Sequence, residues 1–147
     1  MIDLKRQSEL REAIELLYFA YRTFTARADR ILADHGLGRV HHRILYFIGR
    51  HPDISVHALL DILKVSKQAL NAPLRRLLAD GLVSAGTATR DHRTKLLRLT
   101  KVGQALESQL TASQTEQLAD VFTSVGQHAE RDWKQVMAFL ADDTNTP

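Results

Sequence analysis

The sequence contains no cysteine, only three prolines and no long hydrophobic run. Without cysteine the chain cannot form a disulfide framework, a thiolate zinc site, an iron–sulfur centre or a thiol redox switch. No apolar stretch approaches the roughly 18 residues that a membrane-spanning helix needs. The first residues mix acids with bases and do not resemble a secretory signal. We therefore expect a soluble, cytoplasmic protein with no membrane partner.

What is present is the composition of an ordinary globular domain, with 147 residues, 44% of them hydrophobic and 25% charged. The net charge of +3 is unevenly distributed. Residues 64–101 hold nine basic and two acidic side chains, a net of +7, whereas the segments before and after them carry +1 and −5. Such a block favours one surface that faces a polyanion such as nucleic acid, although a solvated basic face produces the same pattern.

Hydrophobic periodicity predicts a mainly helical fold. A heptad-like spacing over residues 10–31 indicates a long helix that packs lengthwise on other helices, and its apolar positions are Leu10, Ile14, Leu17, Tyr21, Phe24, Ala28 and Ile31. Further helices are predicted over 40–50, 55–63 and 66–80, followed by two C-terminal helices that Gly126 separates.

The middle of the chain predicts a winged helix-turn-helix. Ser55 and Ser66 are typical N-caps of two short helices joined by a three- or four-residue turn. Residues 82–89 and 95–100 are strand-like, with a polar link between them, and we expect them to form a two-stranded β wing. Pro73 falls inside the second short helix, where it removes a backbone donor, so we predict a kink or a widened turn there.

Four short motifs occur in order along this region: Ser66-Lys67, Gly81-Leu82-Val83, Asp91-x-Arg93-x-Lys95 and Leu99-Thr100-x-x-Gly103. Together they resemble the MarR family of bacterial transcriptional regulators over residues 37–103. The resemblance implies a homodimer of winged helix-turn-helix lobes whose N- and C-terminal helices interlock. It predicts dimerisation helices at 1–36 and 102–147 and a DNA-binding lobe at 37–101.

Spacing on the 66–80 helix indicates how DNA would be read. Gln68, Asn71 and Arg75 stand at i, i+3 and i+7, so they share a face that fits a major groove. Arg75 and Arg76 lie further along and are expected to contact phosphates. The resemblance implies that Arg93 enters the minor groove with Asp91 bracing it, whereas Asp91 could equally be a turn residue. The predicted DNA-binding residues are Ser55, Ser66, Lys67, Gln68, Asn71, Arg75, Arg76, Arg90, Asp91, Arg93 and Lys95.

An effector site follows from the resemblance alone. The family's pocket lies between the dimer helices and the DNA-binding lobe, which here would involve Tyr18, Tyr21, Arg22, His41, His42 and Phe47. Aromatic walls with cationic groups suit a small aromatic or phenolic acid. Plain packing accounts for each of these residues as well.

Few features of the sequence support catalysis or metal binding. No HExxH, GxSxG or P-loop motif occurs, adjacent His41 and His42 point about 100° apart on a helix, and His57 with Asp61 suits an exposed pair. We predict no metal, no cofactor and no enzymatic activity. The predicted function is a sequence-specific transcriptional regulator, a ligand-responsive repressor that acts as a homodimer on a pseudo-palindromic operator. The alternatives are a non-specific or architectural DNA-binding protein and a winged helix used only for protein contacts.

Overall fold

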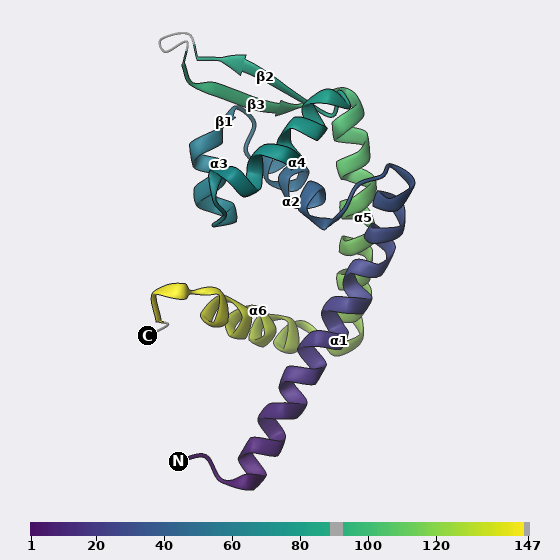
Figure 1. The fold of residues 1–147 in the computed structure, drawn as a ribbon. Helices are drawn as coiled ribbons and strands as arrows, with labels where there is room; N and C mark the ends of the chain where they lie inside the picture. Colours follow the sequence, from purple (N-terminus) through teal and green to yellow (C-terminus); the bar gives the residue numbers. More distant parts are fainter. Residues whose placement is uncertain (89–92, 146–147) are drawn as a thin grey trace.

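Helices dominate the structure, which consists of one lobe and two projecting arms (Figure 1). One arm is the N-terminal half of the first helix, and the other is the last helix. The computed structural model describes residues 1–88 and 93–145. The elements are α1 (Leu4–Asp34), α2 (Arg39–Arg50), β1 (Ile54–Ser55), α3 (Val56–Leu63), α4 (Lys67–Ala79), β2 (Val83–Thr87), β3 (Lys95–Leu99), α5 (Lys101–Val125), α6 (Gln127–Ala141) and the 3-10 turn η1 (Asp143–Asn145). No described helix combines the length and the hydropathy that crossing a bilayer requires.

The predicted N-caps of the lobe are confirmed. The hydroxyls of Ser55 and Ser66 accept hydrogen bonds from the backbone N–H groups of Ala58 and Ala69, at 3.1 and 3.0 Å. Each bond satisfies one of the donors that a helix start leaves free. Between the two helices Lys64 takes the left-handed conformation, with φ of 55°, that glycine usually provides in such a turn. The helix-turn-helix therefore forms without a glycine.

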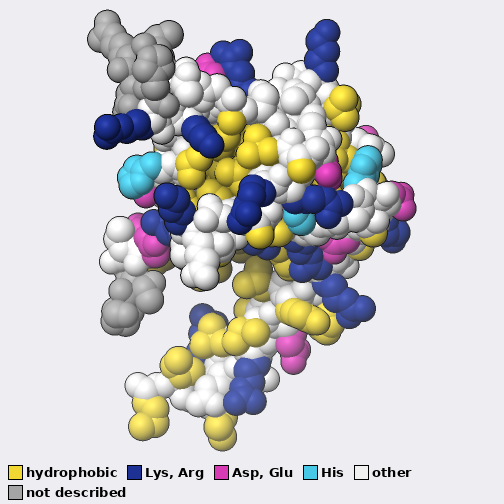
Figure 2. Space-filling model, turned by 45° about the horizontal axis from the view of Figure 1, so that its top comes forward, with side chains coloured by type: hydrophobic (Ala, Val, Ile, Leu, Met, Phe, Trp, Pro, Cys, Tyr) yellow, Lys and Arg dark blue, Asp and Glu magenta, His cyan; other side chains and the backbone are white. Residues whose placement is uncertain are grey.

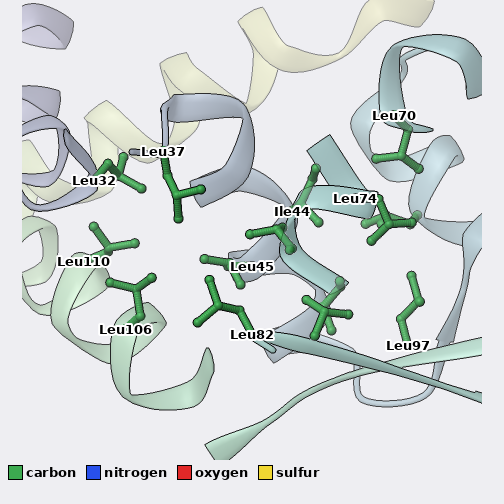
Figure 3. Packing of buried hydrophobic residues seen from close by; sticks show 14 of the residues in the cluster. Leu32, Leu37, Ile44, Leu45, Leu70, Leu74, Leu82, Leu97, Leu106 and Leu110 are labelled. Carbon is green, nitrogen blue, oxygen red and sulfur yellow. The ribbon is translucent and has the colours of Figure 1, made fainter. Parts of the chain in front are cut away.

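One hydrophobic core holds the lobe together (Figure 3). Its fully buried large side chains come from α1 through α5 and from β3, and they are Leu32, Ile44, Leu45, Ile48, Leu59, Leu70, Leu77, Leu97 and Leu110. Because Leu32 of α1 and Leu110 of α5 belong to this cluster, the core crosses the predicted domain divisions at residues 36 and 101. The inner ends of both long helices are thus part of the lobe.

The wing is part of a three-stranded antiparallel sheet in the order β1-β3-β2. β2 and β3 pair from Val83 opposite Leu99 to Thr87 opposite Lys95, as the two-stranded prediction requires. The third strand, β1, was not predicted. It pairs Ile54 with Leu97, both buried, and at two residues it is too short to show an alternating pattern.

α1 extends beyond the periodic stretch 10–31 at both ends, and only its C-terminal part joins the core. It begins at Leu4, where the carboxylate of Asp3 accepts from the N–H of Arg6 at 2.8 Å. Of the predicted apolar seam, Ala28 is buried, whereas Leu10, Ile14, Leu17 and Tyr21 are exposed. Hydrophobic side chains line the projecting half of the helix (Figure 2).

Helix α4 continues from Lys67 to Ala79 with Pro73 inside it. The structure therefore tolerates the missing donor of Pro73 without ending the helix. The predicted kink stays a prediction. The division between α5 and α6 falls at Gly126, as predicted, with φ of 94°.

Candidate nucleic-acid interface

The outward side of α4 carries the predicted DNA-reading residues. Lys67, Gln68, Asn71 and Arg75 are all exposed, whereas Leu70, Leu74 and Leu77 of the same helix are buried in the core. This division follows from helical periodicity, since residues three or four apart share a face. Lysine and arginine side chains are spread over this part of the lobe (Figure 2). The helix thus presents two amides and two cations, while its other side is held by packing.

Arg76 differs from this group, although the sequence placed it among the phosphate contacts. Its Nε donates to Oδ2 of Asp80 at 2.8 Å, and its Nη2 donates to the carbonyl oxygen of His35 at 3.2 Å. Two of its donors are therefore occupied within the protein. Because the partners of the second bond are 41 residues apart, no local pattern indicated it.

The strands of the wing, β2 and β3, lie above α3 and α4 in the view of Figure 1. Lys95 is exposed at the start of β3, and Arg93 is exposed in the turn before that strand. Arg90 and Asp91, which were also predicted to contact DNA, lie outside the described residues. Ser55 and Ser66 stand at the starts of α3 and α4, with their hydroxyls engaged in the caps.

An ion pair ties the wing to the turn that precedes β1. Arg98 of β3 donates from Nη2 to Oδ2 of Asp53 at 2.6 Å, and its Nε donates to the other carboxylate oxygen. The guanidinium bonds lower the pKa of the Asp53 carboxyl. This bidentate pair gives Arg98 a structural partner.

A hollow of about 340 Å³ opens between α1, α2 and α5. Three of the predicted effector residues line it, namely Tyr21, His42 and Phe47. Tyr18, Arg22 and His41 are not among its lining residues. His41 is instead used at the start of α2, where its Nδ1 accepts from the N–H of Gly38 at 2.9 Å.

Charged residues that the sequence analysis missed also line this hollow. Arg39 forms a bidentate pair with Asp29, with Nη2 2.9 Å from Oδ2, and lies 5.2 Å from the ring centre of Tyr21. Arg43 and Tyr46 add a further cation and hydroxyl. Burial lowers the pKa of His42, and the charge of Asp29 opposes this shift while the charge of Arg43 adds to it. Asp29 and Arg39 carry opposite charges and stand on the two sides of the Gly36–Gly38 loop. This feature of the sequence could have predicted that they pair.

Within the described residues, no group of three or more histidine, aspartate or glutamate side chains could hold a metal ion. His57 and Asp61 approach to 3.7 Å, and both side chains are largely exposed. They form the exposed i,i+4 pair that the spacing suggested.

The geometry is that of a winged helix-turn-helix, a module that places one helix in a DNA groove. Comparisons with known proteins agree. A MarR family model matches residues 35–94. The HTH-type transcriptional regulator PetP of Rhodobacter capsulatus is 42% identical over 134 residues, covering 91% of this chain and 81% of PetP.

Solved structures share the fold. Streptococcus pneumoniae FabT in complex with DNA aligns with a TM-score of 0.72 and 17% identity, over 94% of each chain. NadR in complex with 4-hydroxyphenylacetate aligns with a TM-score of 0.71 and 21% identity, over 86% of this chain and 89% of NadR. The chain belongs to the MarR family. It is a DNA-binding transcriptional regulator and not an enzyme.

Proposed function

We propose that two copies of this chain bind one pseudo-palindromic operator, with α4 of each copy in a major groove. The observation that carries this proposal is the exposed row of Gln68, Asn71 and Arg75 on a helix whose opposite side is fixed in the core. Glutamine and asparagine amides pair with adenine edges, and each such pair discriminates by about 1–3 kcal/mol. FabT, which shares the fold, was solved in complex with DNA, and this supports DNA as the partner.

The remaining predicted residues, apart from Arg76, act on the sugar–phosphate backbone and the flanking minor groove. Arg93 and Lys95 bring the wing's positive charge to the minor groove next to the site that α4 reads. Arg90 and Asp91 belong to the same wing tip in the sequence. At the starts of α3 and α4, next to Ser55 and Ser66, backbone N–H groups bind phosphates. Lys67 binds a phosphate through its positive charge.

A second copy of this chain covers the apolar faces of the two arms. In one copy these faces leave large hydrophobic side chains exposed, namely Leu10, Ile14, Leu17, Tyr18, Phe19, Trp133, Val136, Phe139 and Leu140. Exposed apolar area on this scale is characteristic of an interface. A two-fold dimer through residues 1–36 and 102–147 sets two α4 helices roughly 34 Å apart, one helical turn of DNA.

Repression is relieved by a small aromatic or phenolic acid that binds in the hollow between α1, α2 and α5. NadR, which shares the fold, binds 4-hydroxyphenylacetate. Here Tyr21, Tyr46 and Phe47 supply aromatic walls, and Arg43 is a cation with no ion-pair partner among the described residues. Such a ligand acts by favouring a spacing of the two lobes that no longer fits successive major grooves.

The operator can be obtained by selecting duplexes from a random pool with the wild-type protein. We expect an enriched sequence with two-fold symmetry, bound more tightly than a scrambled duplex at every salt concentration. A steep salt dependence without any enriched sequence would instead identify a non-specific or architectural DNA-binding protein. Failure to bind either duplex would leave the alternative of a winged helix used for protein contacts.

The ligand can be tested with 4-hydroxyphenylacetate as the probe. We expect calorimetric binding to the wild type and release of the selected duplex. Arg43→Gln should weaken the calorimetric binding, whereas Arg22→Gln is the matched control, because Arg22 is an exposed arginine of α1 outside the lining. Equal losses in both variants would contradict the placement of the ligand in this hollow.

A further inference from the structure

Adjacent arginines of α4 have different surroundings. Arg75 is exposed and has no ion-pair partner among the described residues. Arg76 reaches in the other direction, to the carboxylate of Asp80 at the end of its own helix and to the carbonyl of His35 at the end of α1. One guanidinium therefore links the DNA-reading helix to the helix whose projecting half carries the exposed apolar face.

The turn after α1 has the shape that this contact needs. Gly36 has φ of +69°, and a Cβ at this position would lie 3.1 Å from Nη2 of Arg76. A left-handed glycine thus both turns the chain and leaves room for the guanidinium. Because His35 is the C-cap residue of α1, its carbonyl is one of those that a helix end leaves without an intrahelical partner.

His41 borders the same contact. Its Nδ1 accepts from the N–H of Gly38, which requires that nitrogen to be unprotonated. Burial and then the charge of Arg76 lower the pKa of His41, while Asp80 opposes them. The imidazole is therefore a natural reporter of whether Arg76 is in place.

We propose that Arg76 is a positioning residue for operator recognition, which holds α4 at a fixed angle to the end of α1 and makes no phosphate contact. This inference rests on the proposed function. Since α1 reaches from the lobe into the arm, the angle at this joint sets the direction in which each α4 meets the DNA. A change in that angle misplaces Gln68 and Asn71 relative to base edges without altering the number of phosphates that are neutralised.

The test compares Arg76→Gln with Arg75→Gln on the selected duplex and on a scrambled duplex, across several salt concentrations. Each lost phosphate contact reduces the slope of log K against log salt by about 0.9. We expect Arg75→Gln to reduce the slope. Arg76→Gln should leave the slope unchanged while affinity for the selected duplex falls roughly tenfold, the scale of a misread base pair. Affinity for the scrambled duplex should stay close to that of the wild type.

A second variant separates charge from geometry. Arg76→Lys keeps the positive charge, but an ammonium on a flexible stem does not reproduce the planar fork that reaches Asp80 and His35 together. We expect it to lose affinity for the selected duplex as Arg76→Gln does. A lysine variant that binds like the wild type, or a reduced slope in Arg76→Gln, would overturn the proposal.

The pKa of His41, measured by NMR titration, is a quantity that a loss of stability alone would not change. In folded Arg76→Gln we expect the pKa of His41 to rise, because a nearby positive charge has been removed. An unmoved titration would show that the arginine is not held at this joint. If the wild type selects no duplex, the proposed function fails, and the His41 titration still decides where Arg76 lies.

Discussion

Gly103 lies against the carbonyl of Leu82 so closely that a Cβ on it would stand 1.9 Å from that oxygen. The same oxygen accepts the N–H of Thr100 at 3.1 Å, and the hydroxyl of Thr100 donates to the carbonyl of Gly81 at 2.6 Å. The first turn of α5 is therefore docked directly on the chain that enters β2. This contact explains why a glycine stands three residues after the threonine cap in the Leu99–Gly103 motif.

Gly103→Ala should destabilise the lobe, because the clash is with backbone and neither α5 nor the wing can yield locally. Overpacking of a well-packed site costs about 1–3 kcal/mol or more, which urea unfolding can measure. Gly86→Ala is the matched control, because a Cβ at Gly86 meets nothing within 4 Å. We expect that variant to change stability by about 0.5 kcal/mol or less. Equal effects in both variants would contradict the close contact between Gly103 and the carbonyl of Leu82.

Gln68→Ala and Arg93→Ala should affect DNA binding in different ways. Removing the Gln68 amide takes away a base contact, so selection from a random pool should give a relaxed preference at particular positions, by about 1–3 kcal/mol per base pair. Removing Arg93 should weaken binding to selected and scrambled duplexes alike and reduce the salt slope. Unchanged affinity in Arg93→Ala would mean that the wing does not contact DNA.

Ile14→Glu should separate the dimer into monomers. Ile14 is 67% exposed in one copy, and a carboxylate buried by the partner would have no counter-charge. Because two-fold symmetry repeats the change, we expect the dissociation constant to rise by roughly a hundredfold or more, measured by sedimentation. Thr23→Glu is the control, nine residues on and therefore on the opposite side of the helix. A dimer of wild-type affinity in Ile14→Glu would exclude this face from the interface.

The free energy of unfolding should fall when the pH drops below the ordinary histidine pKa of about 6.5. Burial lowers the pKa of His42, so the folded protein binds fewer protons than the unfolded chain in this range. The stabilisation is complete above pH 6.5 and is lost as the pH falls through the lowered value. His42→Gln should flatten the decline of the melting temperature between pH 7 and 5. An equally steep decline in His42→Gln would contradict this role of His42.

Sequence reasoning was most successful where an interaction joins residues close in the chain. Ser55 and Ser66 were recognised as helix starts, and each hydroxyl accepts from an N–H three residues further on. It was less complete for contacts between distant segments. β1 was missed, and so were the bond from Arg76 to the carbonyl of His35 and the pair of Arg39 with Asp29.

The order of the helices, the winged helix-turn-helix and the outward row of polar residues on α4 could be predicted from residue patterns alone. These features depend on periodicity, capping and turn chemistry, which act over a few neighbouring residues. Which cations form pairs within the protein became clear only from the packed fold. The pairs of Arg39 with Asp29, Arg98 with Asp53 and Arg76 with the end of α1 depend on how helices and strands pack. A local pattern contains no information about such angles and distances.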